Sequence, residues 1–301
     1  MRPRDYLTTA FSVVLFGLVG KLCCYAGPEE SEIPTEQIIP SQSNSGLIGR
    51  WLDMVTRIQA EQPSWVTPIV TVTPRLEQEL RYDQFWESQP HGAWLDSYGG
   101  GKGLELIPMQ NIEVILGIPA YQVHSSPKEA NGFADWPLLF KYRILSGNAE
   151  HGDYILTAFL GFTFPTGNNN NTNHYEITTP TLAFGKGFGK FDVQSTFGVS
   201  IPSIGGPHRG PGTPILWNTA LQYHLDRFFW PEVEFNYTYW PNGTDRYKKQ
   251  LFVTPGIIVG RFPIHVRGSP DRGYRKSHLL PKCDFNGQVA VLTDLRGRRY
   301  F

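Results

Sequence analysis

Apolar and polar residues alternate through most of residues 65–260, in segments of strand length that clusters of Gly, Pro and Asn separate. Successive side chains of a strand point to opposite faces of a sheet, so this period of two predicts strands with one apolar and one polar face. Val233 and Phe235, for example, are expected to face lipid or a core, whereas Glu232 and Glu234 are expected to face water. No helical pattern interrupts this region.

The longest of these segments runs from Ile69 to Asp83 and alternates between two kinds of residue, with the charged ones on a single face. A strand of a soluble protein is usually ~5–6 residues long, whereas a tilted strand needs ~9–11 residues to cross a membrane. The length therefore favours a spanning strand. The same alternation predicts further strands at residues 104–120, 136–145, 154–164, 175–185, 191–201, 215–225, 229–239 and 251–261.

Two segments of a different kind precede these strands. Residues 27–45 are rich in Pro, Glu, Ser and Asn, which is typical of a disordered linker. From Leu47 to Gln59, apolar residues recur at helical spacing and predict a short amphipathic helix. We expect this helix to pack against the strands; the alternative is a periplasmic plug or a partner contact.

The N-terminus has the pattern of a secretory signal. Arg2 and Arg4 give a positive start, Leu7 to Val19 is apolar, and Ala26 is a small residue suited to cleavage. The apolar stretch is shorter than the ~20 residues that a spanning helix needs. An uncleaved anchor helix is the alternative interpretation.

Cleavage after Ala26 gives a direct prediction. Mass spectrometry of the exported protein should identify Gly27 as its first residue. An intact N-terminus in the membrane fraction would contradict the signal-peptide interpretation.

Composition excludes several classes of protein. The chain has 301 residues, enough for one large β domain or two small ones, and its 27 Lys and Arg balance its 27 Asp and Glu. A net charge of zero argues against nucleic acid as a partner. A mean hydropathy of −0.29 excludes a bundle of membrane helices. A transmembrane barrel accommodates this polarity, because every second strand residue faces a wet interior.

Candidate catalytic chemistry is missing from the sequence. We find no Gly-x-Ser-x-Gly, no His-Glu-x-x-His and no pair of cysteines at zinc spacing. We therefore expect no enzyme activity, no cofactor and no metal site. Only Cys283 would remain after cleavage of the signal, which excludes a disulfide framework. The run Gly99–Gly103 lacks the Ser or Thr of a phosphate loop, so we interpret it as a flexible loop.

Connections between the predicted strands alternate in length. Residues 146–153, 186–190 and 226–228 are short and turn-like, whereas residues 168–174, 203–214 and 240–250 are longer and polar. Short turns at one end and longer loops at the other are typical of outer-membrane barrels. The strand count creates a conflict, however. With a periplasmic N-terminus, it places the short turns outside, so either strands before Trp136 are missed or this barrel departs from the usual arrangement.

Several runs resemble a known family. They are Phe133–Arg143 (FADWPLLFKYR), Tyr154–Gly161 (YILTAFLG), Pro165–Gly167, Thr179–Gly187 (TPTLAFGKG) and Asp192–Ser195 (DVQS). Together they resemble the putative outer-membrane transporters grouped with the phenol meta-degradation pathway channel proteins, over roughly Trp65 to Ile264. The resemblance implies a barrel that passes small, often hydrophobic or aromatic, molecules. It assigns no binding residue.

The C-terminus departs from this resemblance. Residues 266–299 are rich in Arg and Lys and show little alternation, and Arg299 stands where an apolar residue would precede the terminal Phe301. A shifted reading frame or a genuine basic tail would each produce this pattern. Without closing strands the barrel would not be sealed.

We thus expect an all-β protein, an antiparallel transmembrane β-barrel of roughly ten to twelve strands, with a signal peptide (1–26), a linker and short helix (27–64), a barrel (65–264) and an atypical basic tail (265–301). It would be a channel of the bacterial outer membrane for small solutes; the alternative is a soluble periplasmic β-sandwich that binds a ligand or partner. Its partners would be the lipid bilayer and the solute. The candidate lumen-lining residues are Glu77, Glu79, Arg81, Lys141, Arg143, His224, Glu232 and Glu234.

Overall fold

The computed structural model describes residues 8–15, 46–88, 93–127, 129–203, 212–226, 228–264, 285–292 and 295–300. The predicted cleavage position and the proposed linker at residues 27–45 lie outside these ranges. Within them the fold is a large antiparallel sheet with one α-helix, α1 (Leu47–Ala60). This confirms the all-β class and the short helix.

In the part of the chain that the structure describes, eighteen strands belong to the sheet. They are β1 (Thr8–Leu15), β2 (Glu79–Arg81), β3 (Gln84–Ser88), β4 (Trp94–Tyr98), β5 (Gly103–Met109), β6 (Ile112–Leu116), β7 (Tyr121–His124), β8 (Gly132–Phe133), β9 (Trp136–Gly147), β10 (Tyr154–Phe164), β11 (Ile177–Phe188), β12 (Phe191–Val199), β13 (Ile201–Pro202), β14 (Ile215–Tyr223), β15 (Phe229–Tyr239), β16 (Lys249–Ile264), β17 (Phe285–Leu292) and β18 (Leu295–Tyr300). One turn of 3-10 helix, Ala149–His151, follows β9.

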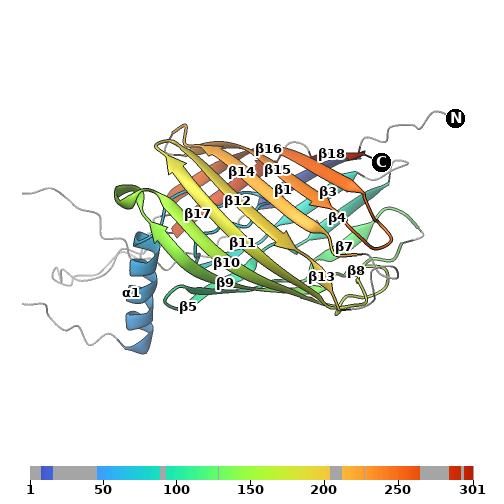
Figure 1. The fold of residues 1–301 in the computed structure, drawn as a ribbon, viewed down its shortest axis with the longest axis horizontal. Helices are drawn as coiled ribbons and strands as arrows, with labels where there is room; N and C mark the ends of the chain where they lie inside the picture. Colours follow the sequence, from blue (N-terminus) through green and yellow to red (C-terminus); the bar gives the residue numbers. More distant parts are fainter. Residues whose placement is uncertain are drawn as a thin grey trace, which may run out of the picture.

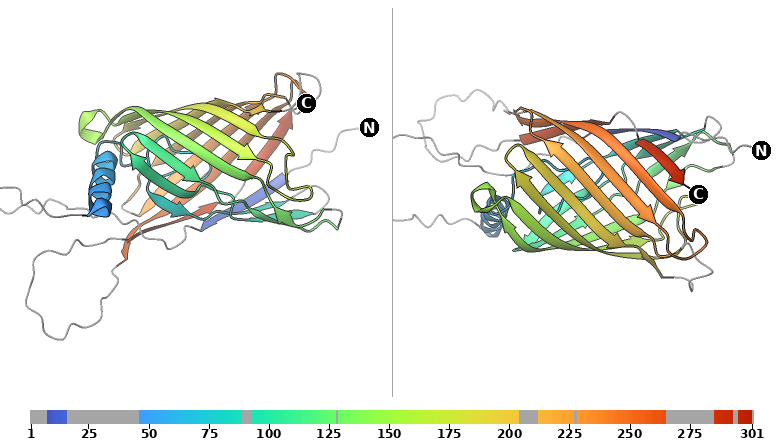
Figure 2. Two further views of the ribbon diagram at one scale, coloured as in Figure 1. Left: turned by 90° about the horizontal axis from the view of Figure 1, so that it is seen from below. Right: turned by 45° about the horizontal axis from the view of Figure 1, so that its top comes forward.

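The sheet curls around a common interior, with α1 across one end (Figure 1). Strands β9, β10, β11, β12, β14, β15 and β16 pair in that order. Beyond β9 the sheet continues through β6 and β5 to β2, and through β8, β7 and β4 to β3. Strands β17, β18 and β1 lie between β16 and β3, and the two further views in Figure 2 show the same curl.

Breaks in six long strands explain why the strand number of the described residues exceeds the ten to twelve expected. Strands β12 and β13 continue one another along β11, and β17 and β18 continue one another along β16. The pairs β2 and β3, β4 and β5, β6 and β7, and β8 and β9 each continue one another across a short irregular link. The links lie side by side, since Gly99 N donates to Asp83 O at 2.9 Å and Ala134 N donates to Ala120 O at 2.8 Å. Gly99 and Gly100 have φ of 81° and 85°, conformations that favour glycine.

Two of the predicted strands require correction. Only Glu79–Arg81 of the predicted strand 69–83 is a strand; residues before it run through the interior without pairing to the sheet. Residues 104–120 form two strands, β5 and β6, because the chain reverses at Gln110 and Asn111. The hairpin of β3 and β4 was not predicted at all.

These corrections resolve the conflict over the connections. The chain crosses the sheet three times before β8 and β9, so β9 runs towards the end that carries α1. The connection after β9 lies there, since Asn148 Nδ2 donates to Ala60 O of α1 at 3.2 Å. By strand alternation, connections 146–153, 186–190 and 226–228 lie at the α1 end, and connections 168–174, 203–214 and 240–250 lie at the other. The connection from β16 to β17, residues 265–284, also follows a strand that runs towards the α1 end.

Asn111 stabilises the turn between β5 and β6, and its substitution gives a testable prediction. Its φ is 63°, and its Oδ1 accepts hydrogen bonds from Arg143 Nε at 3.0 Å and Nη2 at 2.9 Å. We expect Asn111→Ala to lower the free energy of unfolding by about 2–4 kcal/mol, because alanine is strained in this conformation and the bonds to a charged group are lost. Asn111→Gly, which relieves only the strain, should lose less in the same chemical-unfolding experiment. Equal losses would contradict this account.

The polar faces of the strands are buried, and large apolar side chains on the opposite faces are exposed. Thr157 and Glu234 are fully buried, whereas Leu160 and Phe235 on the opposite faces of the same strands are 41% and 38% exposed. The predicted alternation is therefore correct, but the polar side chains expected to face water are buried. Buried apolar residues form two small clusters, one around Ile69 and Trp230 and the other around Ile58 and Leu76.

In the described part of the chain, α1 does not meet the length and hydropathy of a membrane-spanning helix, and no other helix does.

Candidate functional site: a polar interior and its internal segment

Residues 62–78, which we call the internal segment, pass through the interior of the sheet. Two glutamates of β15 hold its backbone. Ile69 N donates to Glu232 Oε1 at 3.1 Å. Val70 N and Thr71 N donate to the two carboxylate oxygens of Glu234 at 2.7 and 2.6 Å. Hydrogen bonds to charged acceptors are the strong kind, so these carboxylates replace the neighbouring strand that the segment lacks.

Strands β10 and β12 hold the same segment from another side. Thr157 Oγ1 donates to Pro74 O at 2.6 Å. Gln194 accepts a hydrogen bond from Thr73 Oγ1 at 2.7 Å and donates to Val66 O at 3.0 Å. Because the segment is not part of a ladder, its polar backbone groups depend on these inward-facing side chains.

A chain of buried charges links the segment to β6 and β9. Lys141 of β9 pairs with Glu113 of β6 at 2.9 Å, and its Nζ also donates to Arg75 O at 3.1 Å. Glu113 Oε2 accepts from Glu77 N at 2.6 Å, and Glu77 pairs with Arg75 at 3.1 Å. Removing one member of such a network leaves an uncompensated buried charge, so the segment is held by electrostatics as well as by backbone bonds.

Arg81 of β2 fastens the segment where it joins the sheet. Its Nε donates to Asp83 Oδ1 at 2.6 Å, and its Nη1 and Nη2 donate to Pro68 O at 3.2 Å and Ile69 O at 2.6 Å. The planar guanidinium suits this role, because its donors lie in a fixed fork.

Helix α1 covers the interior at the end with the short connections. Val55 and Ile58 are buried against Leu76 and Ile107, and Trp51 Nε1 donates to Ile107 O at 2.7 Å. Arg143 Nη1 of β9 donates to Ile58 O at 2.9 Å. The helix therefore packs against the sheet, as preferred from the sequence, and it also leads directly into the internal segment.

The structure brings together most of the residues predicted to line the interior. Glu77, Arg81, Lys141, Arg143, Glu232 and Glu234 are buried there, and Glu79 is half-buried on β2. These buried residues contact protein groups rather than open water, because the internal segment fills the space. His224 is not among the buried charges: it is exposed just beyond the end of β14, where it stacks on the buried Trp230 with ring centroids 4.9 Å apart.

Other buried interior residues were not named as candidates from the sequence, although the alternation had placed Arg75, Asp83, Gln194 and Gln222 on polar strand faces. They are Arg75, Asp83, Lys102, Glu105, Glu113, Gln194 and Gln222. If the turn at Asn111 had been recognised, residues 103–109 would have been predicted as a separate strand, and its alternation places Glu105 on the polar face. Lys102 carried no such signal, because it lies in the glycine-rich break between β4 and β5, which we interpreted as a flexible loop.

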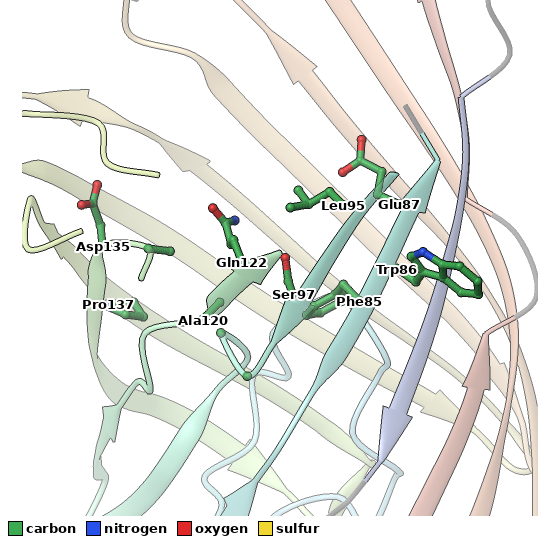
Figure 3. Close-up of a pocket in the computed structure, with 12 residues that line it drawn as sticks. Phe85, Trp86, Glu87, Leu95, Ser97, Ala120, Gln122, Asp135 and Pro137 are labelled. Atoms are coloured by element: carbon green, nitrogen blue, oxygen red, sulfur yellow. The ribbon is translucent and has the colours of Figure 1, made fainter. Parts of the chain in front are cut away.

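Two adjoining cavities lie beside the row of strand breaks. The larger has a volume of ≈ 350 Å³ and is lined by residues that include Phe85, Leu95 and Gln122, which Figure 3 shows on neighbouring strands. The smaller has a volume of ≈ 270 Å³ and lies against the internal segment. Both are lined by Phe85, Gly100 and Pro137, so they adjoin one another.

Asp135 lines the larger cavity in the link between β8 and β9. Burial alone would raise its pKa, but hydrogen bonds, among them those from Asn173 N at 2.8 Å and Gly167 N at 3.0 Å, hold the pKa of Asp135 below its ordinary value. A carboxylate whose pKa is lowered in the folded protein stabilises the fold at every pH above its ordinary pKa. That stabilisation is lost as the pH falls through the lowered pKa. Asp135 thus fastens residues 167–173 at neutral pH.

Comparisons with known proteins add no identity. No family model, no curated protein and no solved structure matches this chain. Within the described ranges no cluster of three or more potential metal ligands occurs.

Proposed function

We propose that the chain is an outer-membrane β-barrel that passes small solutes through an interior partly filled by the internal segment. The observation that carries the proposal is the inverted distribution of side chains. Large apolar residues such as Leu182, Phe184 and Phe197 are about half exposed, while charged residues such as Glu234 and Lys141 are buried. In water this arrangement is unfavourable, whereas in lipid the exposed apolar face is the stable one.

Closure of the sheet is part of this proposal. An open edge in lipid leaves backbone groups unsatisfied at a cost of several kcal/mol each. Strands β17 and β18 pair with β16, β1 pairs with both of them, and β1 also pairs with β3. These three strands therefore connect β16, at one edge of the sheet, with β3, at the other edge. Because Thr8–Leu15 lies within the predicted signal peptide, cleavage would remove β1, the strand that pairs with β3, so closure of the mature barrel requires β17 or β18 to pair with β3 in its place. Residues 265–284 of the basic tail lie outside the described residues.

The arrangement of connections supports the same proposal. Outer-membrane barrels have short periplasmic turns and longer outer loops. Here the three short connections lie at the end of α1, the helix that follows the predicted signal and linker, and we assign this end to the periplasm. The resemblance to the phenol meta-degradation pathway channel proteins favours small, hydrophobic or aromatic solutes.

The internal segment sets the transport mechanism that we propose. Its contacts with β9, β10, β12 and β15 obstruct the interior, so a solute passes only when part of the segment moves aside. The charged groups that then line the path, among them Lys141, Glu232 and Glu234, would select solutes by charge. Passage remains passive, since nothing in the proposal couples it to an energy source.

A soluble periplasmic β-sandwich is the alternative. A sandwich buries the apolar faces of its strands between two sheets. Exposure of Leu182, Phe197 and Phe235 favours the barrel over this alternative, because a sandwich would need those side chains in its core.

Fractionation and reconstitution test the proposal together. We expect the mature protein to extract with the outer membrane, to migrate differently on a gel before and after heating, and to make liposomes permeable to small sugars. Protein that is soluble without detergent would contradict the barrel. A heat-modifiable protein that leaves liposomes impermeable would contradict the channel but not the barrel.

A further inference from the structure

The smaller cavity is lined mainly by apolar residues and Gly, with Arg81, Asp83 and Lys102 as its charged lining residues. Val70 and Val72 of the internal segment face it, and Ile115 of β6 and Leu139 of β9 line it from the sheet. Its volume of ≈ 270 Å³ is at the small end of ligand sites, which typically measure ~300–1,000 Å³. The walls therefore suit the apolar body of a small molecule.

Lys102 is the feature that points to a ligand. It lines the cavity and is only 8% exposed. No hydrogen-bond partner is present for its Nζ among the described residues, and no ion pair with it forms there. Buried ammonium groups are normally paired, because burial of a lone charge is costly. An anion in the cavity would supply the missing partner.

Neighbouring carboxylates do not fill this role. Asp83 lines the same cavity, but its Oδ1 accepts from Arg81 Nε at 2.6 Å. Glu105 attracts Lys102 electrostatically, yet no ion pair joins them, and both carboxylate oxygens of Glu105 also lack a hydrogen-bond partner. The cavity is lined by two cations, Arg81 and Lys102, and by one carboxylate, Asp83, and of these Lys102 has no hydrogen bond to its charged group.

We propose that this cavity binds a small amphipathic carboxylate, with its anionic group on Lys102 Nζ and its apolar body against Val70, Val72, Ile115 and Leu139. This deepens the proposed function and rests on it for the route of entry. The adjoining ≈ 350 Å³ cavity, which shares three lining residues, gives the ligand a path to this site. The same ammonium would discriminate against neutral molecules of equal size.

Calorimetry on the detergent-solubilised protein tests the site with hexanoate and its neutral analogue hexanamide. We expect the protein to bind hexanoate at least tenfold more tightly than hexanamide. Lys102→Met should lower hexanoate affinity at least tenfold and change hexanamide affinity less than threefold. Lys102→Arg should keep the preference for the acid, and Lys248→Met, which changes an exposed lysine on a loop, should leave both affinities unaltered.

Equal affinity of the unaltered protein for the acid and the amide would overturn the proposal, even if Lys102→Met fails to fold. An acid preference that survives in folded Lys102→Met would overturn it as well, and would indicate that Glu105 neutralises Lys102 without a ligand. Liposome permeability separates the two proposals. Selective binding without permeability contradicts the channel alone, whereas permeability without selective binding contradicts this site alone.

Discussion

Leu182→Arg is expected to lower the free energy of unfolding in phospholipid vesicles by ~2–4 kcal/mol, the usual effect of an arginine at the bilayer midplane of a barrel. Leu182 lies near the middle of β11, is 46% exposed and has Ala158 and Phe197 as its cross-strand neighbours. The cost arises because an outward guanidinium at this depth has no water to solvate it. Urea titration followed by tryptophan fluorescence measures the change.

Phe188→Arg is the matched control on the same strand and the same face. Phe188 is 62% exposed and ends β11 beside the short turn to β12, close to the proposed interface with water. We expect it to lose ~0–1 kcal/mol. If both variants change stability by less than ~0.5 kcal/mol, as exposed substitutions in soluble proteins usually do, the outer face is in water and the barrel proposal fails.

Glu234→Gln is expected to raise the permeability of reconstituted liposomes by about tenfold to a hundredfold. The carboxylate accepts hydrogen bonds from Val70 N and Thr71 N, whereas a glutamine amide offers one oxygen and turns its NH₂ towards the second donor. Losing a bond to a charged group costs ~1.5–3 kcal/mol, and each 1.4 kcal/mol changes a population about tenfold. The internal segment would therefore leave its position more often.

Glu176→Gln provides the control for this measurement. Glu176 is exposed in the connection before β11, so its substitution makes the same change of charge away from the internal segment. We expect its permeability to match that of the unaltered protein. An unchanged rate for Glu234→Gln in a stably folded protein would mean that the segment does not limit passage.

The sequence was sufficient where structure is set by local alternation. The period of two in β10 and β15 assigns Thr157 and Glu234 to one side and Leu160 and Phe235 to the other, because a slip of one residue would exchange every side chain between the faces. The same pattern does not say which face is buried. In β10 and β15 the buried face is the one that carries Thr157 and Glu234. Most of the predicted interior residues lie where expected for this reason.

The errors have a different origin. Residues 69–78 alternate as a strand does, but their amide partners are the side chains of Glu232 and Glu234, more than 160 residues away in the chain. No local pattern contains that information. Asn111 is the opposite case, since asparagine tolerates positive φ and a turn between apolar runs was recognisable from its sequence.

Contacts between the internal segment and β15 also constrain the order of folding. The hydrogen bond from Ile69 N to Glu232 spans 163 positions, and that from Val70 N to Glu234 spans 164. Contacts of such separation form late, since the loop between them must be closed before they contribute any stability. The segment is synthesised early but finds its acceptors only after β15 is in place, so the unfinished chain exposes a partly apolar stretch until then. We expect this step to be slow and to favour aggregation unless a chaperone protects residues 62–78.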